Sequence, residues 1–281
     1  MILEVCVDSV ESAVNAELGG ADRIELCGDL IVGGTTPSLA LYERIREKIN
    51  IPIHVLLRPR FGDFLYSEEE IEILTRQAEA FSKAGADALV IGCLTADGQL
   101  DTEVLNRIMD AGKGTPYNLH RAFDMCRDLD ETLETARKLG IVSILTSGGV
   151  ASAPDGIQTL NRLKQNAGNV DIMAGAGINS QNLSYMLEHS CLTAFHMSAF
   201  EYLKGTSISD NASIPDGDKR QYIRAISRAT SRLKSIVIRF FIRLIQLQDS
   251  QESFLRHFPH YRSVSSVSFL SSVSQAIFFS G

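Results

Sequence analysis

The sequence predicts an α/β fold, a (β/α)8 barrel of the TIM type, over residues 1–235. Short runs of β-branched and apolar residues alternate with amphipathic stretches, which is typical of strands that alternate with helices. Eight such units fit into residues 1–235, close to the ~250 residues that this barrel needs. Gly-Ala-Asp recurs at 20–22 and 85–87, directly before the second and fourth strands. This recurrence indicates one strand–helix unit that is used repeatedly.

The elements follow in order along the chain. Strands are expected at residues 2–7, 23–27, 53–58, 88–92, 117–120, 143–146, 170–174 and 193–198. Helices are expected at residues 10–18, 38–49, 68–83, 102–111, 130–139, 156–166 and 180–188, with 218–234 as the eighth. Ser67 and Glu70 have the spacing of a capping box at the start of the third helix. An open doubly wound sheet is the alternative, but eight regular units and the lack of a glycine fingerprint after the first strand favour closure.

Composition restricts the class of protein. The 281 residues are 44% hydrophobic and 22% charged, which is typical of a globular protein. A net charge of −7 argues against a general nucleic-acid binder. No apolar run reaches the ~20 residues of a membrane span, and the start lacks a signal peptide. The five cysteines form no compact framework, which favours reduced thiols and a cytoplasmic protein, with the nucleus as a second location left open.

The composition changes near residue 235. Residues 236–281 contain four Arg, one Asp and one Glu, and they hold seven of the 13 Phe together with ten Ser. The chain before this point is strongly acidic, so the two parts do not share one folding pattern. We therefore expect a barrel domain over 1–235 and an atypical, poorly ordered tail over 236–281 that the barrel does not need.

The first two strands end in the same pair of side chains, a carboxylate and a thiol. Side chains alternate along a strand, so Glu4 shares a face with Cys6, and Glu25 shares a face with Cys27. If these faces point into the barrel, the carboxylates need cations, which we expect from the arginines of the third strand. The thiols are either core fillers, as free cysteine commonly is, or a pair of soft metal ligands.

Polar residues also stand where the third and fifth strands end. Arg58 and Arg60 follow the third strand, and the fifth runs into His120 and Arg121, with Asp124 three residues later. One interpretation is structural, with a hydrogen-bonded histidine beside an Arg–Asp pair. The other is functional, with an acid–base group beside an anion clamp. The sequence leaves both open.

Late strands add glycines and one histidine. Gly148 follows the sixth strand, and Gly175 and Gly177 follow the seventh, where backbone amides could hold an anion. Such glycines are also needed merely to turn out of a barrel. His196 lies in the eighth strand, which closure brings beside the first strand and its thiol. Imidazole and thiolate suit Cu(I) or Zn(II), although no CxxC or HExxH spacing is present.

These strand ends resemble the CutC family of copper homeostasis proteins. The matching motifs include Leu-Glu-Val-Cys-Val-Asp-Ser at 3–9, Arg-Pro-Arg at 58–60 and His-Arg-Ala-Phe-Asp at 120–124. The other matching segments are residues 20–27, 33–38, 62–67, 145–148 and 174–177. Phe61 stands where the family commonly has glycine, and Phe200 where relatives often have arginine. The resemblance covers residues 1 to about 200, more loosely to 235, and does not include the tail.

The resemblance implies a single-domain barrel that is mainly cytoplasmic and assembles as homodimers or homotetramers. It implies copper(I) binding, with Cys6 and Cys27 as thiol ligands, to which we add His196 as a third ligand. It implies no particular reaction. The alternative is a metal-independent enzyme for a small anionic substrate, without nucleic-acid or membrane partners. In that enzyme Glu25, His120 and Asp124 carry the acid–base chemistry, while the arginines and glycine loops hold the anion.

Overall fold

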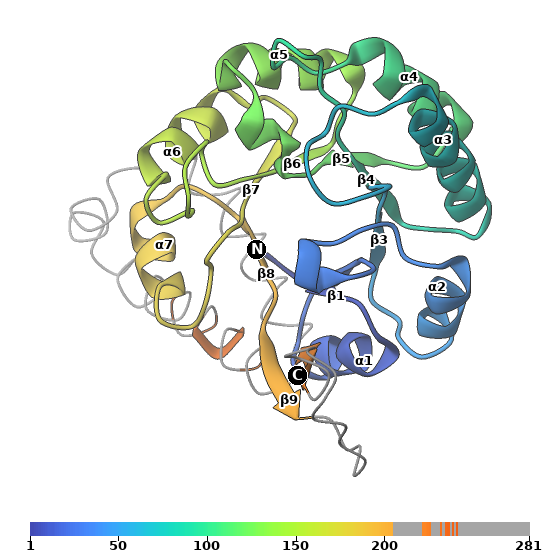
Figure 1. The fold of residues 1–281 in the computed structure, drawn as a ribbon. Helices are drawn as coiled ribbons and strands as arrows, with labels where there is room; N and C mark the ends of the chain where they lie inside the picture. Colours follow the sequence, from blue (N-terminus) through green and yellow to red (C-terminus); the bar gives the residue numbers. More distant parts are fainter. Residues whose placement is uncertain (205–220, 226–230, 232–233, 237, 239, 241–281) are drawn as a thin grey trace, which may run out of the picture.

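A closed barrel of eight parallel strands forms the centre of the molecule, in a computed structural model that describes residues 1–204, 221–225, 231, 234–236, 238 and 240. The strands are β1 (Ile2–Val7), β2 (Arg23–Leu26), β3 (Ile53–Leu56), β4 (Ala88–Ile91), β5 (Tyr117–Leu119), β6 (Ser143–Thr146), β7 (Asp171–Ala174) and β8 (Ala194–Met197). Strand β1 pairs with both β2 and β8, which closes the ring (Figure 1). The predicted (β/α)8 class is confirmed.

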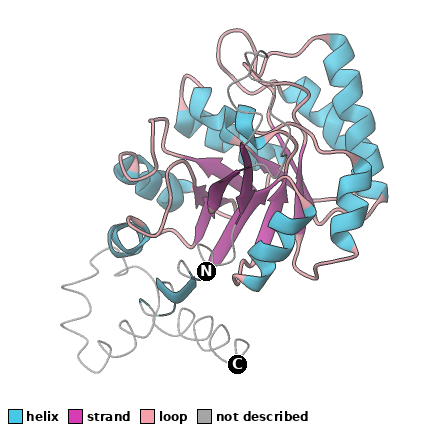
Figure 2. Cartoon of the chain, turned by 60° about the horizontal axis from the view of Figure 1, so that its bottom comes forward, coloured by secondary structure: helices cyan, strands magenta, loops and turns pink. Residues whose placement is uncertain are grey.

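Helices surround the strands on the outside (Figure 2). They are α1 (Val10–Leu18), α2 (Leu39–Arg46), α3 (Glu68–Lys83), α4 (Thr102–Ala111), α5 (Leu129–Leu139), α6 (Ile157–Asn166) and α7 (Leu183–His189). Two 3-10 helices, η1 (Leu30–Val32) and η2 (Arg121–Met125), follow β2 and β5. The predicted capping box at Ser67 and Glu70 begins α3 with both reciprocal hydrogen bonds. No helix within the described residues is long and apolar enough to cross a membrane.

Several boundaries differ from the predictions by one to three residues, and α2 ends at Arg46 instead of residue 49. Strand β3 ends at Leu56, so Arg58 lies beyond it in a loop. Helix α7 begins three residues late, because the side chains of Asn179 and Asn182 hydrogen-bond to the backbone of the preceding loop. The prediction of an eighth helix at 218–234 is wrong in its first half. Gln221–Ala225 forms strand β10 instead, which pairs antiparallel with β9 (Phe200–Lys204). The backbone hydrogen bonds between β9 and β10 override the local helix propensity on which the prediction depended.

The last described residues pack against the barrel. Ile236 and Phe240 are buried in the main apolar core, and Lys234 forms an ion pair of 2.5 Å with Asp22, which precedes β2. The predicted boundary at residue 235 stays a prediction, and most of the tail lies outside the described residues. These contacts nevertheless show that the apolar core includes side chains beyond residue 235.

The barrel has an apolar outer shell and a partly polar interior. Outward-facing residues of the strands, such as Leu3, Val5 and Ile24, join the helices in the main core. Two smaller apolar clusters are separate from it: one holds Cys6, Cys27, Leu56 and Val90, and the other Leu145, Met173 and Ala194. Strand alternation therefore places both thiols on the inward faces, as predicted, and leaves polar side chains to fill the remaining interior.

Candidate functional site

A cavity of about 730 Å3 opens at the C-terminal ends of the strands. It is lined by the ends of β1, β2, β3 and β8, by η1 and η2, and by the loop at 176–179 that follows β7. The C-terminal ends of the strands are where barrels of this class place their functional residues. Among the predicted site residues, the cavity brings together Cys6, Glu25, Cys27, Arg58, His120, Arg121, Gly177 and His196. Asp124, Arg60, Gly148 and Gly175 are not among its lining residues.

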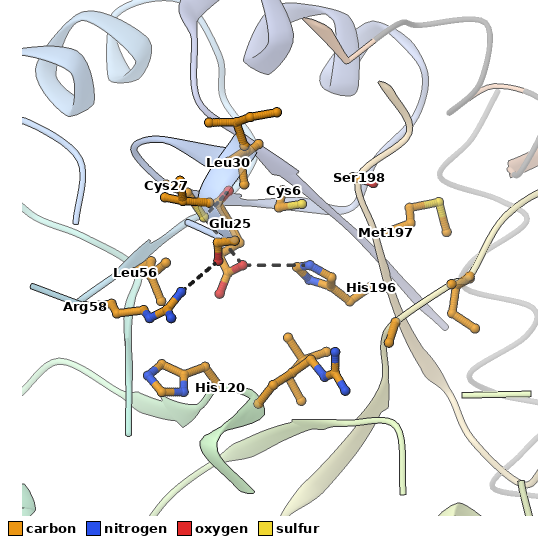
Figure 3. A pocket seen from close by; sticks show the side chains of 18 of the residues that line it. Cys6, Glu25, Cys27, Leu30, Leu56, Arg58, His120, His196, Met197 and Ser198 are labelled. Carbon is orange, nitrogen blue, oxygen red and sulfur yellow. Dashed lines mark hydrogen bonds and ion pairs between the residues drawn. The ribbon is translucent and has the colours of Figure 1, made fainter. Parts of the chain in front are cut away.

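Cys6 lies near the end of β1 and Cys27 directly follows β2, on the same wall of the cavity (Figure 3). Both thiols belong to one small apolar cluster with Leu56 and Val90. Cys27 Sγ is 3.7 Å from Glu25 Oε2. Burial raises the pKa of Cys27 well above its ordinary value, and the neighbouring Glu25 and Cys6 side chains raise it further. Cys27 is therefore a protonated thiol at neutral pH.

Glu4 is the centre of a buried ion-pair network inside the barrel. Its carboxylate is 2.5 Å from Arg23 Nε, 3.4 Å from His54 Nδ1 and 2.7 Å from His196 Nδ1. Burial alone would raise the pKa of Glu4, but the bonds to both histidines and the charge of Arg23 lower it well below its usual range. The expected pairing with third-strand arginines is wrong, because the parallel register sets Glu4 beside Arg23 on β2 and His196 on β8.

His196 lies between two carboxyl groups. Its Nδ1 donates to Glu4, and its Nε2 is 3.8 Å from Glu25 Oε2. Burial alone would lower the pKa of His196, but its interactions with Cys6, Glu4 and Glu25 raise it well above the ordinary value. Burial also raises the pKa of Glu25, which the attraction of His196 only partly offsets. The wall beside the thiols therefore holds an imidazolium and a weakly acidic carboxyl group.

Arg58 and Arg60, adjacent to the same proline, have different partners. Arg58 lines the cavity, and its Nη atoms donate to the carbonyl oxygens of Gly33, Gly34 and Gly62 at 3.3, 3.0 and 3.0 Å. Among the described residues it forms no ion pair. Arg60 points away from the cavity and pairs with Asp63 and Glu70 at 3.0 and 2.7 Å. Of these two arginines, both predicted to bind an anion, only Arg58 is therefore available in the cavity.

His120 lines the cavity as a neutral imidazole. The Ala122 N–H donates to His120 Nδ1 at 3.1 Å, so the ring proton lies on Nε2. Burial, with a contribution from the charge of Arg58, lowers the pKa of His120 to about 3. The ring also lies against Gly92, where an added Cβ would come within 2.4 Å of its Cε1. His120 is therefore fixed as a hydrogen-bond donor.

Both carboxylate oxygens of Asp124 accept hydrogen bonds from the protein itself. It accepts from Thr146 Oγ1 at 2.5 Å, from the N–H groups of Ser147 and Gly149 at 3.1 and 3.0 Å, and from Arg121 Nε at 2.9 Å. The carboxylate ties η2 to the loop after β6 and orients Arg121, whose Nη2 also donates to Ser147 Oγ. For Asp124 the contacts favour the structural interpretation over the acid–base one.

The three predicted glycines have different roles. Gly148 and Gly175 serve packing, since an added Cβ would lie 2.9 Å from the Gly156 carbonyl oxygen and 2.4 Å from Leu145 Cδ1, respectively. Only Gly177 lines the cavity, with a φ of 78° that favours glycine. Phe61, which departs from the family motif, is exposed at the surface beyond the cavity.

Sequence reasoning missed several members of the site. Arg23 and His54 hold Glu4, and Phe64 packs between Arg58 and His120, with its ring 5.2 Å from Arg58 Cζ and 4.9 Å from the imidazole centre. The register of a parallel barrel is the signal that could have found Arg23, two residues before Glu25. Within the described part of the chain, no group of three or more His, Cys, Asp or Glu side chains is arranged to hold a metal ion.

Comparisons with known proteins agree on one family. The CutC family profile matches residues 1–201. The chain is 48% identical over 199 residues to the human "Copper homeostasis protein cutC homolog", covering 70% of this chain and 73% of the human one. A Bacteroides fragilis family protein CutC is 38% identical over 243 residues, covering 84% of this chain and 97% of its own.

Solved structures agree with the fold. The crystal structure of a putative copper homeostasis protein CutC from Streptococcus agalactiae has a TM-score of 0.66 and 29% identity, covering 70% of this chain and 97% of its own. A thiamine phosphate pyrophosphorylase from Pyrococcus furiosus has a TM-score of 0.53 and 16% identity, over 85% of this chain and 96% of its own. That likeness concerns the fold alone.

Proposed function

This chain belongs to the CutC family, and we propose that it acts in copper homeostasis by binding copper(I) through Cys6 and Cys27. The observation that carries the proposal is the placement of Cys6 near the end of β1 and of Cys27 directly after β2, both on the wall of one cavity. Thiolates are the ligands that Cu(I) prefers. The proposal includes a cytoplasmic location and a homodimer or homotetramer.

Proton release accompanies this binding. Metal binds the thiolate, so the proton of Cys27 must leave when copper enters. Glu25, 3.7 Å from Cys27 Sγ, is placed to accept it. His196 can serve as a third ligand only after Nε2 turns from Glu25, because Nδ1 is bound to Glu4. Two sulfur ligands, with His196 and Glu25 as neighbouring proton carriers, are the simplest arrangement.

An anaerobic titration against a competing Cu(I) chelator tests the proposal. The double variant Cys6→Ser, Cys27→Ser should lose about 100-fold or more in Cu(I) affinity, because it removes both soft sulfur ligands. Cys191→Ser is the matched control, since this half-buried thiol lies against Asn161 outside the cavity and should leave affinity unchanged. Unchanged affinity and stoichiometry in the double variant would refute the site.

A second candidate function is acid–base catalysis on a small anionic substrate without metal. The specific observation is Arg58, a cation in the cavity wall without an ion-pair partner among the described residues, in the same cavity as Glu25. Glu25 has a raised pKa, as a proton donor or acceptor near neutral pH needs. Glu25 and His196 would move the proton and His120 would donate a hydrogen bond. Asp124 would act only by holding Arg121.

A further inference from the structure

Two buried N–H donors at the cavity wall have no hydrogen-bond partner among the described residues. They are Arg58 Nε and His120 Nε2. The other polar atoms of these side chains are used, since Arg58 donates to three carbonyl oxygens and His120 Nδ1 accepts from Ala122. Leaving buried donors unpaired is costly, so this pair indicates a ligand with matching acceptors.

Both donors belong to one wall of the cavity. The Phe64 ring packs against the Arg58 guanidinium and against the His120 imidazole. Figure 3 shows Arg58 and His120 on the side of the cavity away from Cys6. The proposed copper ligands therefore leave both donors free for a different occupant.

The cavity also has an apolar wall and ample volume. Leu30, Ile31 and Val32 of η1 line it, and Ile31 and Val32 are 69% and 43% exposed. Its volume of about 730 Å3 lies within the range of roughly 300–1,000 Å3 that small-molecule sites have, and far exceeds that of one metal ion. An occupant that fills it would cover the apolar side chains of η1.

We propose that the cavity binds a small organic monocarboxylate with a short apolar chain. Its two carboxylate oxygens accept from Arg58 Nε and His120 Nε2, and its chain lies against Leu30, Ile31 and Val32. Phe64 shifts aside as the carboxylate enters, because its ring packs against both donors. This inference rests on the second candidate function and names its substrate class.

A carboxylate fits better than a phosphate. Two unused donors match two oxygens, whereas phosphate presents more oxygens and more negative charge. The other cations of the cavity wall are already paired, Arg121 with Asp124 at 2.9 Å and His196 with Glu4 at 2.7 Å. The positive charge left for a ligand is therefore mainly that of Arg58.

Binding of a homologous series by the full chain tests the proposal. Calorimetry with acetate, butyrate and hexanoate should show affinity rising with length by up to about fourfold per added CH2, which is the ~0.8 kcal/mol of a buried methylene. Inorganic phosphate should bind more weakly than hexanoate. Affinity independent of chain length, or phosphate as the tightest ligand, would overturn the proposal.

Two variants with a matched control locate the site. Arg58→Gln and Ile31→Asp should each weaken hexanoate binding by about tenfold or more, by loss of the charge and by repulsion of the ligand from η1, respectively. Leu18→Asp is the control: Leu18 is 72% exposed, like Ile31, but ends α1 at the opposite end of the barrel. Because Ile31 is exposed, Ile31→Asp should fold even if Arg58→Gln does not. Equal hexanoate affinity in the two Asp variants would refute the site.

Separate readouts distinguish this proposal from the others. Arg58→Gln should keep Cu(I) affinity while losing hexanoate, because both thiols remain. Exchange of the C3 hydrogens of 2-oxohexanoate in D2O, followed by NMR, tests acid–base catalysis, because the neighbouring ketone makes these hydrogens acidic. Binding without exchange would overturn the enzyme but support the carboxylate site, and absence of binding in the folded protein would overturn the site itself.

Discussion

Two groups of polar residues at the barrel mouth look alike in the sequence and differ in the structure. Around Asp124, the loop after β6 and η2 satisfy every carboxylate oxygen with protein donors. Around Arg58 and His120, one N–H of each side chain remains unpaired among the described residues. Polar residues whose bonds are all made within the protein hold the fold together. Unmet bonds alone do not mark a site, since buried polar atoms of Asn118 and Ser143 also lack partners among the described residues but do not line the cavity. Arg58 and His120 combine unmet bonds with a place in the cavity wall, which makes them available to a ligand.

The largest expected effect is on stability, from Asp124→Asn against Glu25→Gln. The Asn variant removes a buried charge and replaces one acceptor oxygen by an NH2 donor, so either Arg121 or the donors of the loop after β6 lose their acceptor. This should lower the free energy of unfolding by about 3–5 kcal/mol. Glu25→Gln should change it by less than about 1 kcal/mol, because burial already raises the pKa of Glu25 and disfavours its charge. Chemical denaturation of both variants measures the difference. Equal losses of stability would contradict the distinction between Asp124 as a structural residue and Glu25 as a site residue.

A smaller effect is expected at the far end of the barrel. Truncation after Lys234 should leave a soluble barrel with a cooperative melt, as the sequence predicts. It should nevertheless lower the free energy of unfolding by about 2–4 kcal/mol. It removes Ile236 and Phe240 from the core, each worth about 1.5–3 kcal/mol when fully buried, and burial that persists in the unfolded chain reduces this sum by up to about 40%. Truncation after Phe240 is the control and should cost less. Loss of cooperative unfolding in the shorter chain would show that the barrel extends past residue 235.

The last effect is a dependence of stability on pH and concerns His120. The pKa of His120 is lowered to about 3, from about 6.5 in the unfolded chain. The unfolded chain alone therefore takes up this proton as pH falls from about 6.5 to 3, and the folded state loses the stability it has above 6.5. His120→Asn keeps an acceptor for Ala122 without this titration, so its stability deficit relative to wild type should shrink from pH 7 to pH 4. Parallel stability curves would show that His120 is not buried as a neutral ring.

The sequence allows much of this architecture to be predicted, because the relevant signals are local. Strand alternation alone places Glu4 with Cys6 and Glu25 with Cys27 inside the barrel. The partners of Glu4 depend on the register between β1, β2 and β8, and the alternation of side chains leaves shifts of two residues open. Asp124 could not be separated from the acid–base residues for a related reason. Besides Arg121, its partners are hydroxyl and backbone N–H groups of Thr146, Ser147 and Gly149, which lie far away in the sequence.

Copper(I) bound between Cys6 and Cys27 can be seen directly in an anomalous difference map at the copper edge from anaerobically Cu(I)-loaded crystals. We expect one peak in contact with both sulfur atoms, on the wall of the cavity beside Glu25. A peak at Cys93, Cys126 or Cys191 instead, or no peak at the two thiols in fully loaded protein, would contradict it.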